Sequence, residues 1–479
     1  MSRPFLSQVI TDDSALGGSV IERSLRFDDN DSTWLERTVS SSSNRRTFTI
    51  SVWIKRSKLG NFPAIFGQTD TSGSYMFYFV FDTSDQLYII DYDYPTNNYH
   101  FVTNRKFRDT LSWYHIVLAV DTTQATNTNR SKLYVNGVQE TSFSTANYPS
   151  QNLDTWVNHT TYPVRIGRHG WSHTHYLGGY MAEYNFVDGS QLDPTHFGYT
   201  ESQTGLWRSK RYEGTYGTNG FYLDFSDNSS TSALGIDKSP NGNDLTTNNF
   251  SVSSGKDGDS FIDTPSNNFS TLNPLVNSNT TQSLSDGNLT RSGGAKKCMA
   301  TFEALNGKYY FEYKAEDGNG NHAIGVCQID TDQRDRINTE AAAIFAANGE
   351  YKIENNSQTS GFAVWGNGAI ISVAIDTTLA TPKVWFAVNN SWQGASGDSG
   401  TFDPFGGYSL TAGKKYTFTV DHGSSSGSTT GTAFFGAHQG EFNYDPPSGF
   451  KTLSTKNLPP NVPSIIRPQK HFDTILYTG

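Results

Sequence analysis

The sequence has little of what marks several common classes of protein. It contains only 2 cysteines in 479 residues, Cys298 and Cys327, which excludes a disulfide scaffold. We expect two buried free thiols, with an intradomain pair as the alternative. Lys and Arg total 36 against 46 Asp and Glu, a net charge of −10 without basic runs, so we expect no nucleic-acid binding. No apolar stretch reaches the roughly 18 residues of a membrane span, so we expect no membrane insertion.

Aromatic residues are abundant instead. Phe, Tyr and Trp make up 14% of the chain, while only 17% of the residues are charged. Aromatic and β-branched side chains favour sheets, and Gly, Asn and Ser favour the turns between strands. In residues 48–55 apolar residues alternate, which predicts a strand with two distinct faces. Asn136-Gly137 predicts a hairpin turn in which both residues have positive φ.

Two series of alternating segments, at about 24–187 and from 286 onward, predict two separate cores, because single cores stop growing beyond roughly 250–300 residues. We therefore predict an all-β protein of two antiparallel β-sandwich domains of jelly-roll type, joined by an irregular connector. The predicted divisions are an N-terminal attachment arm (1–20), a first sandwich (21–200), the connector (201–285), a second sandwich (286–450) and an extended proline-containing tail (451–479).

The connector carries aromatic residues that would be costly to leave in water, by roughly 1.5–3 kcal/mol each. We therefore expect it to pack on both sandwiches through Phe221, Tyr222, Phe225, Phe250, Phe261 and Phe269. Residues 340–348 (Glu-Ala-Ala-Ala-Ile-Phe-Ala-Ala-Asn) have the only strongly helical composition in the chain. They predict at most one or two helical turns.

Several segments, taken in order, resemble known domains. The first half resembles laminin G-like domains of the concanavalin A-like superfamily at residues 24–28, 48–55, 113–121, 132–138 and 164–167. The second half resembles a SPRY domain at residues 307–313, 323–326, 370–376 and 384–392. Both resemblances imply curved two-sheet sandwiches whose loops present a binding edge.

The joining segments resemble virion structural and tail-fibre-like proteins of marine tailed phages. These segments are residues 214–223, 239–245, 263–265, 271–275 and 447–459. The resemblance implies a tail fibre, spike or capsid-decoration protein that attaches to host-surface glycan or protein. It implies location on the exposed virion surface after assembly in the host bacterial cytoplasm, contacts with other virion proteins through the N-terminal segment, and a homotrimer.

Catalytic residues are not expected. Glucanases of the concanavalin A-like superfamily need two carboxylates on one strand, in the order Glu-x-Asp-x-x-Glu. The spacings from Glu183 to Asp188 and from Glu441 to Asp445 do not place both carboxylates on one face. No Ser-His-Asp order, HExxH or phosphate loop occurs either. We expect a non-enzymatic protein; the alternatives are a glycan-degrading depolymerase and a purely structural assembly protein.

Two acidic clusters are rich in oxygen ligands of the kind that calcium prefers. They are residues 28–31 (Asp-Asp-Asn-Asp) and the pair Asp91 and Asp93. A solvated turn is the favoured interpretation, because no EF-hand ligand spacing is present. We therefore expect no metal site and no cofactor, with calcium as the alternative.

One histidine cluster comprises His169, His173 and His175, next to Trp171 and Tyr176. Alternation would place His173 and His175 on one face of a strand, where they could bind a transition metal. A hairpin tip that carries polar aromatic residues is the favoured interpretation, because a third ligand at suitable spacing is not evident.

Aromatic residues in loops are the strongest candidates for ligand binding. Aromatic rings stack on the apolar faces of sugars, while Asn and Asp bond the hydroxyls. The predicted ligand-binding residues are Tyr92, Tyr94, Tyr99, Asp91 and Asp93, beside Asn97 and Asn98, together with Trp171 and Trp392. The alternatives are protein–protein packing for the tyrosine loop and a core position for Trp392.

Overall fold

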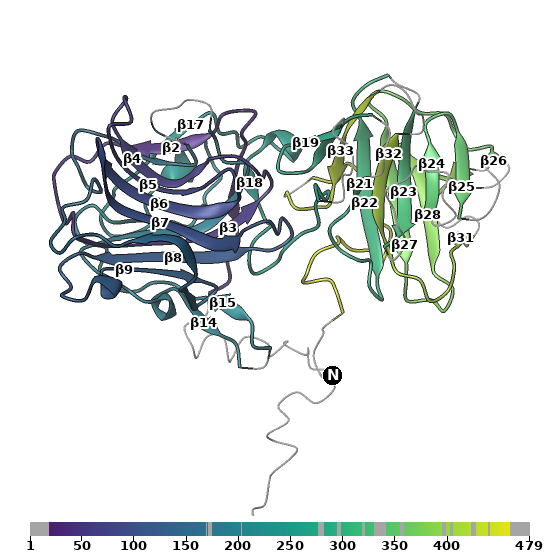
Figure 1. Ribbon diagram of the computed structural model, residues 1–479. Helices are drawn as coiled ribbons and strands as arrows, with labels where there is room; N and C mark the ends of the chain where they lie inside the picture. Colours follow the sequence, from purple (N-terminus) through teal and green to yellow (C-terminus); the bar gives the residue numbers. More distant parts are fainter. Residues whose placement is uncertain are drawn as a thin grey trace, which may run out of the picture.

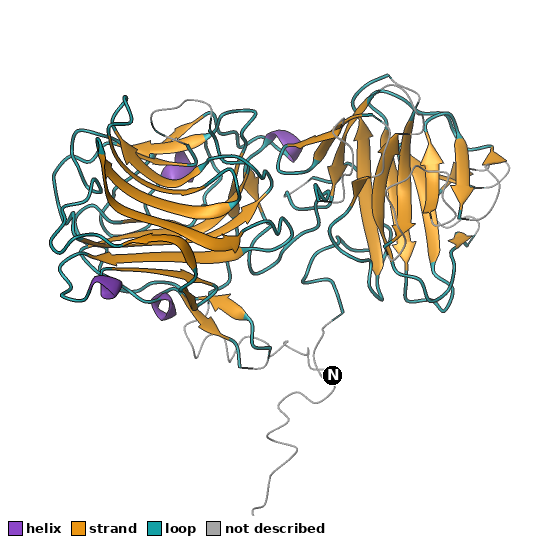
Figure 2. Ribbon diagram, viewed as in Figure 1, coloured by secondary structure: helices purple, strands orange, loops and turns teal. Residues whose placement is uncertain are grey.

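The computed structural model describes residues 19–459, except for 169, 171–174, 203, 276–281, 295–297, 319–320, 330–341, 355–358, 395–398, 403–405, 423–427 and 439–440. Two sandwiches lie side by side, the first coloured purple to teal and the second green to yellow (Figure 1). Strands dominate both (Figure 2). The predicted all-β fold of two antiparallel sandwiches is confirmed.

Within the described residues, the first sandwich has two eight-stranded sheets. The β3 sheet consists, in spatial order, of β10 (Val138–Glu140), β9 (Ser131–Val135), β8 (Tyr114–Asp121), β3 (Thr47–Arg56), β13 (Gly179–Asp188), β1 (Ser24–Phe27) and β18 (Ser260–Phe261), with β16 (Phe221–Leu223) paired to β13. The β5 sheet consists of β11 (Phe143–Asn147), β7 (Thr96–Lys106), β6 (Gln86–Asp93), β5 (Tyr75–Phe81), β4 (Ala64–Thr69), β12 (Val164–Ile166), β2 (Trp34–Arg37) and β17 (Thr246–Asn248). A two-stranded pair is formed by β14 (Gly198–Thr200) and β15 (Trp207–Ser209).

Strand β3 alternates as its sequence predicts. Phe48, Ile50, Val52 and Ile54 belong to the core between the sheets, and Thr49, Ser51, Trp53 and Lys55 alternate with them. This second face is buried as well, because later segments cover it. The hairpin between β9 and β10 also forms as predicted, since Asn136 and Gly137 both have positive φ.

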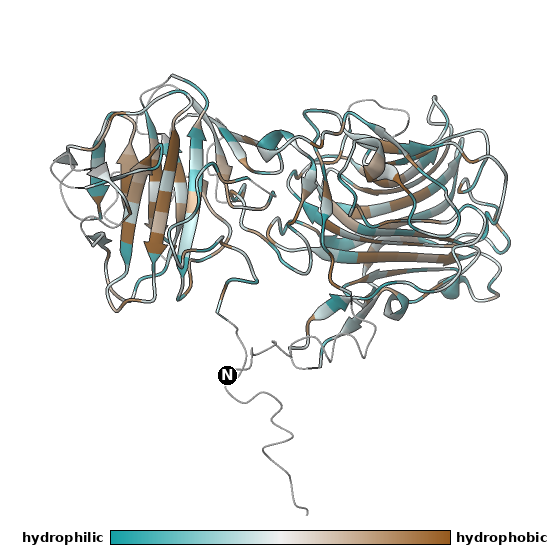
Figure 3. Ribbon diagram, turned by 180° about the vertical axis from the view of Figure 1, so that it is seen from behind, coloured by the Kyte–Doolittle hydropathy of each residue, from teal (hydrophilic) through white to brown (hydrophobic). Residues whose placement is uncertain are grey.

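The second sandwich again pairs two sheets. One consists of β19 (Gln282–Ser285), β20 (Thr290–Gly293), β33 (Thr429–Phe434), β22 (Lys308–Ala315), β27 (Ile370–Asp376), β28 (Lys383–Val388), β29 (Ser391–Gln393) and β30 (Ser399–Gly400), with β31 (Tyr408–Ser409) paired to β28. The other consists of β21 (Cys298–Met299), β32 (Tyr416–His422), β23 (His322–Gln328), β24 (Ala342–Ala346), β25 (Glu350–Ile353) and β26 (Thr359–Ser360). Hydrophobic colour concentrates along these strands (Figure 3). Both cysteines are buried and free, as expected.

The prediction of helical turns at 340–348 is wrong. Residues 342–346 form β24, which pairs with β23 and β25. Ala343 and Phe345 are fully buried in the second core, and Phe345 lies opposite Ile324. Pairing on both sides and burial of alternate residues override the weak helical preference of a short Ala-rich segment.

The connector is more regular than expected. Within 201–285, β16, β17 and β18 add strands to the first sandwich, and β19 belongs to the second. Its six aromatic residues are buried, as predicted. Phe221, Phe225 and Phe250 pack in the first core, while Phe261 and Phe269 belong to the cluster of the second. The connector therefore packs on both sandwiches.

The second sandwich docks on the outer face of the β3 sheet. Trp53, Trp113 and Tyr180 of the first sandwich join the hydrophobic cluster of the second. The Lys55 ammonium donates to Asp263 Oδ2 and Asn268 Oδ1, both at 2.8 Å, and to the Phe269 carbonyl. The two cores thus meet across a junction that contains a buried ion pair.

Helical structure in the described residues is limited to four short 3-10 helices. These are η1 (Asn127–Asn129), η2 (Pro194–His196), η3 (Ser232–Gly235) and η4 (Gly255–Asp257). None of the helices in the described part of the chain is long and apolar enough to cross a membrane. The predicted arm lies outside the described residues up to residue 18, as does the predicted tail from residue 460. The start of that tail folds back, since Leu453 is buried and Lys451 N donates to the Lys308 carbonyl.

Lys55→Met should destabilise the protein by about 3–5 kcal/mol, because it leaves the buried Asp263 carboxylate without its cation. Lys58→Met is the matched control, since the Lys58 side chain is 49% exposed in its ion pair with Asp29 and should contribute less than about 1 kcal/mol. Urea unfolding followed by tryptophan fluorescence measures both. Equal unfolding midpoints for the two variants would contradict the structural role of Lys55.

Candidate functional site

Five neighbouring strands of the β5 sheet end together at one end of the first sandwich. Pairing in register connects them, from β6 through β5, β4 and β12 to β2. The register partners at this end are Tyr75 with Asp93, Thr69 with Met76, Gln68 with Val164, and Val164 with Arg37. The loop that precedes β12 runs along the same end and carries further aromatic side chains.

Four rings gather there and form what we call the aromatic rim: Tyr75, Trp156, His159 and Tyr162. The Trp156 ring centroid lies 4.9 Å from that of Tyr75, 4.8 Å from that of His159 and 5.9 Å from that of Tyr162. His159 and Tyr162 are stacked at 5.5 Å. Tyr75 is exposed and the other three residues are half-buried, so the rim is accessible from solvent.

Buried polar groups hold the rim in place. Asp91 Oδ2 accepts a hydrogen bond from the Trp156 backbone N–H at 2.8 Å, and Asp91 Oδ1 accepts one from Asn98. Gln68 Nε2 donates to the carbonyls of His159 and Tyr162, both at 2.6 Å. These bonds fix the rim loop to β6 and β4, and fixed rings bind a ligand at lower entropic cost.

Charge and burial shift several ionisation equilibria here. Burial raises the pKa of Asp91 to about 7, although its two hydrogen bonds and the nearby Arg45 oppose the shift. Burial and the charge of Arg45 lower the pKa of His159. The Arg45 guanidinium lies 5.5 Å from the Trp156 ring centroid, where it makes a cation–π contact.

The sheet places the predicted ligand-binding residues of the tyrosine loop, which we call the predicted platform, on opposite faces. Tyr99 is fully buried in the first core with its hydroxyl bonded to Ser131, and Asp91 is fully buried beneath the rim, so neither can contact a ligand directly. Tyr92 is half-buried on the outer face of the sheet, while Asp93 and Tyr94 are exposed at the turn. Alternation causes this division, because neighbouring strand residues point to opposite faces.

Asp93 and Tyr94 nevertheless adjoin the rim. The Tyr94 N–H donates to the Ser74 carbonyl at 2.9 Å, and Asp93 pairs with Tyr75 across β5 and β6. Tyr92 and Tyr94 pack edge to face at 6.2 Å. The site therefore shares one turn with the predicted platform, but most of its rings come from the loop before β12.

The structure corrects the predicted ligand-binding role of Trp392. It is 5% exposed and packs among Trp385 and Phe402 on the second sandwich, so it fills a hydrophobic cluster and does not face a ligand. Trp171, His169 and His173 lie outside the described residues. His175 contacts Asn61 at 3.2 Å and lies near Phe62.

The carboxylates considered for catalysis support loops and strands. Glu183 accepts from the Tyr222 hydroxyl at 2.8 Å, and burial raises its pKa to about 7. Asp188 Oδ2 accepts from the Asn219 N–H, and Glu441 Oε2 from the His438 N–H. Each of these three carboxylates is thus engaged in a hydrogen bond that fixes local structure.

The acidic turn at 28–31 borders a cavity of about 510 Å³ between the sandwiches. Asp28 Oδ1 accepts from the Asn30 N–H at 2.9 Å, and Asp29 forms an ion pair with Lys58. In the described ranges, no group of three or more His, Cys, Asp or Glu side chains is placed to hold a metal ion. The turn residues instead bond one another and a neighbouring strand end.

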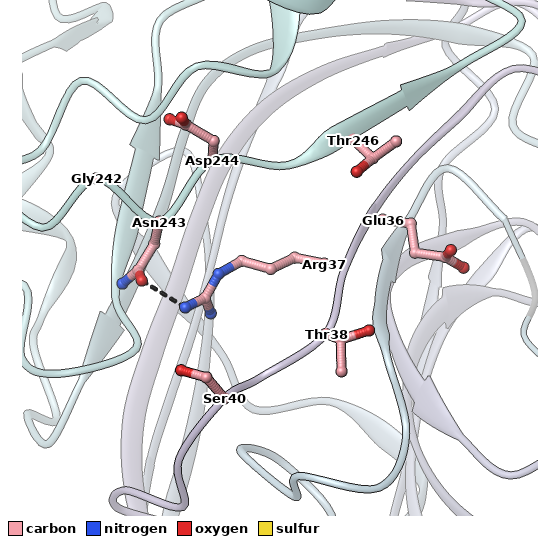
Figure 4. A pocket seen from close by; sticks show the side chains of 8 residues that line it. All are labelled: Glu36, Arg37, Thr38, Ser40, Gly242, Asn243, Asp244 and Thr246. Carbon is pink, nitrogen blue, oxygen red and sulfur yellow. Dashed lines mark hydrogen bonds between the residues drawn. The ribbon is translucent and has the colours of Figure 1, made fainter.

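A polar cavity of about 440 Å³ lies where β2 ends and β17 begins, and we call it the Arg37 pocket (Figure 4). It is lined by Glu36, Arg37, Thr38, Ser40, Gly242, Asn243, Asp244 and Thr246. The Arg37 side chain extends across it and donates to Asn243 Oδ1. Asp237 fixes the opposite wall by accepting from the Asn243 N–H at 2.7 Å.

Part of the first sandwich matches a known protein family. Residues 29–194, about a third of the chain, match the family described as the concanavalin A-like lectin/glucanases superfamily. The matched residues lie within the first sandwich, so this part of the chain is similar to laminin G-like domains of concanavalin A-like type. No curated protein matches the chain.

Solved structures similar to the chain share little sequence with it. The SPRY domain of human HERC1 is 12% identical, with 32% of this chain and 89% of that one covered and a TM-score of 0.24. Domains LG4-5 of the mouse laminin alpha1 chain are 9% identical, with 88% and 90% covered and a TM-score of 0.30. Domain 4 of the arabinanase AbnA from Geobacillus stearothermophilus, in complex with arabinotriose, is 18% identical, with 33% and 66% covered and a TM-score of 0.25.

Asp91→Asn should change how stability depends on pH. Because the folded pKa of about 7 lies above the usual 3.8, native Asp91 favours folding most below pH 4 and loses that contribution as pH rises to 7, by about 1.4 kcal/mol per pH unit. The difference in unfolding free energy between native protein and variant should follow this slope. Asp93→Asn, at an exposed position, is the control. Parallel pH profiles for native protein and Asp91→Asn would contradict the assignment.

Proposed function

We propose that this protein is a non-enzymatic binding protein whose aromatic rim holds a glycan. One observation carries the proposal: four rings lie together at the surface, and the backbone of the three that come from the loop is bonded to buried Asp91 and Gln68. An aromatic cluster that served only to fill a core would be buried, whereas Tyr75 is 37% exposed.

Sugars suit such a surface because their apolar C–H faces stack on rings while their hydroxyls bond nearby polar groups. Asp93, Asn97 and Thr96 are exposed on the adjoining turn and supply those polar groups. The family match to lectins and glucanases over residues 29–194 supports this class of ligand. Host protein is the alternative ligand.

The virion role extends this proposal. The resemblance of the joining segments to tail-fibre-like proteins of marine tailed phages supports a fibre, spike or capsid-decoration component on the exposed virion surface. In this proposal the N-terminal segment contacts other virion proteins, the protein is a homotrimer, and assembly takes place in the host bacterial cytoplasm. Several weak sites on one particle then bind a host surface with high avidity.

Lack of catalysis is part of the proposal. The rival is a glycan-degrading depolymerase, which needs an acid and a nucleophile or base on either side of a glycosidic bond. Glu183, Asp188 and Glu441 are held by structural hydrogen bonds, which favours binding without hydrolysis. A purely structural role, without any external ligand, is the second rival.

Trp156→Ala should weaken binding to host-surface polysaccharide by about tenfold or more, since a loss of about 1.4 kcal/mol corresponds to a factor of ten. Tyr444→Ala, at a half-buried tyrosine of the second sandwich, is the control and should bind like the native protein. Isothermal titration calorimetry measures both. Unchanged affinity in Trp156→Ala would show that the rim is not the binding surface.

Purified protein incubated with the same polysaccharide should release no reducing ends. Reducing ends above the level in a heat-denatured control would instead establish depolymerase activity.

In a density map of intact particles, we expect Tyr75 and Trp156 on the outer surface. Burial of both against a neighbouring subunit, together with silence on a glycan array, would support the structural role.

A further inference from the structure

Two arginines at the end of the first sandwich form no direct ion pair among the described residues, although the charge of Asp237 acts on Arg37 and Arg45 acts on Asp154. Arg37 donates to the amide oxygen of Asn243, and Arg45 donates to the carbonyl of Thr155 at 2.7 Å. Neighbouring arginines differ, since Arg46 and Arg165 both form ion pairs. Arginines without a direct ion pair, in a chain of net charge −10, mark a place suited to an anionic ligand.

The two arginines lie on one continuous strip. Arg45 contacts the Trp156 ring of the aromatic rim, and Arg37 pairs in register with Val164, two residues after Tyr162. Neighbouring strands lie about 4.8 Å apart, so the step from β5 through β4 and β12 to β2 spans about 14 Å. The rim and the Arg37 pocket are thus close enough for one oligosaccharide to reach both.

The Arg37 pocket has the chemistry of a sugar subsite. Its lining is almost entirely polar. The Arg37 guanidinium points toward Asn243 and Ser40, while Thr38 and Thr246 lie nearer the start of the Arg37 side chain (Figure 4). A guanidinium binds a carboxylate through two parallel hydrogen bonds, and hydroxyls bond the ring oxygens around it. Asp244 also lines the pocket, which disfavours a ligand with densely packed negative charges.

We propose that the aromatic rim and the Arg37 pocket together bind an acidic oligosaccharide of uronate type. The rim stacks on sugar faces, Arg37 binds one carboxylate in the pocket, and Arg45 faces a second near Trp156. This inference rests on the proposed glycan-binding function and names the class of glycan. It also assigns a ligand-contacting role to Arg37.

Oligomers of polygalacturonate and alginate, each beside its carboxyl-reduced form, test the inference by calorimetry on the full chain. The native protein should bind at least one acidic form about tenfold or more tightly than its reduced counterpart. Arg37→Gln should abolish most of that preference, because it should weaken binding of the acidic form about tenfold more than binding of the reduced form. Trp156→Ala should weaken both forms, because stacking does not depend on the carboxylate.

Arg108→Gln is the matched control, because Arg108 is 53% exposed and pairs with Asp85 away from the strip; it should keep the preference. Thermal unfolding of Arg37→Gln checks that the variant is folded, and Arg37→Lys, which keeps the charge without the planar fork, should retain part of the preference. The proposal of an acidic ligand is overturned if the native protein binds the acidic and reduced forms equally well, or if Arg37→Gln weakens binding of both forms equally. Either result leaves the proposal of glycan binding intact. Absence of binding to every form overturns both proposals.

Discussion

Polar side chains that lie on buried strand faces need fixed partners, and this constraint governs the whole molecule. Lys55 is the clearest case: its ammonium is 1% exposed and bonds three oxygens of the 263–269 segment. An unpaired charge at this depth would be strongly unfavourable. The bonds therefore attach the connector, which carries Phe269 of the second core, to the outer face of the first sandwich.

Asp91 obeys the same constraint at the end of the first sandwich. It continues the inward-facing set of β6 beyond the hydrophobic core, where the Trp156 N–H and Asn98 supply its partners. A loop without regular structure thus acquires a fixed backbone, and its rings stay together at the surface. The buried Asp91 carboxyl group, together with Gln68, therefore fixes the position of the candidate site.

Sequence reasoning succeeded where a pattern repeats along a strand and failed where packing between segments decides. The alternation of β3 and the Asn136-Gly137 turn were predictable because they depend on local geometry. Residues 342–346 look helical by composition, yet they pair on both sides as β24. The rim was missed because Trp156, His159 and Tyr162 lie in a loop without periodicity; their spacing of three residues was the available signal.

The sequence by itself determined the all-β class, the two cores and the general place of an aromatic turn near Tyr94, because strand period and turn chemistry are local properties. Only the tertiary structure decided which aromatic residues are exposed. Tyr99 and Trp392 are buried, whereas Tyr75 meets Trp156 across 81 positions of sequence at 4.9 Å between ring centroids. Such contacts depend on which strands become neighbours, and the pairing of distant strands is set by the packing of the whole sandwich.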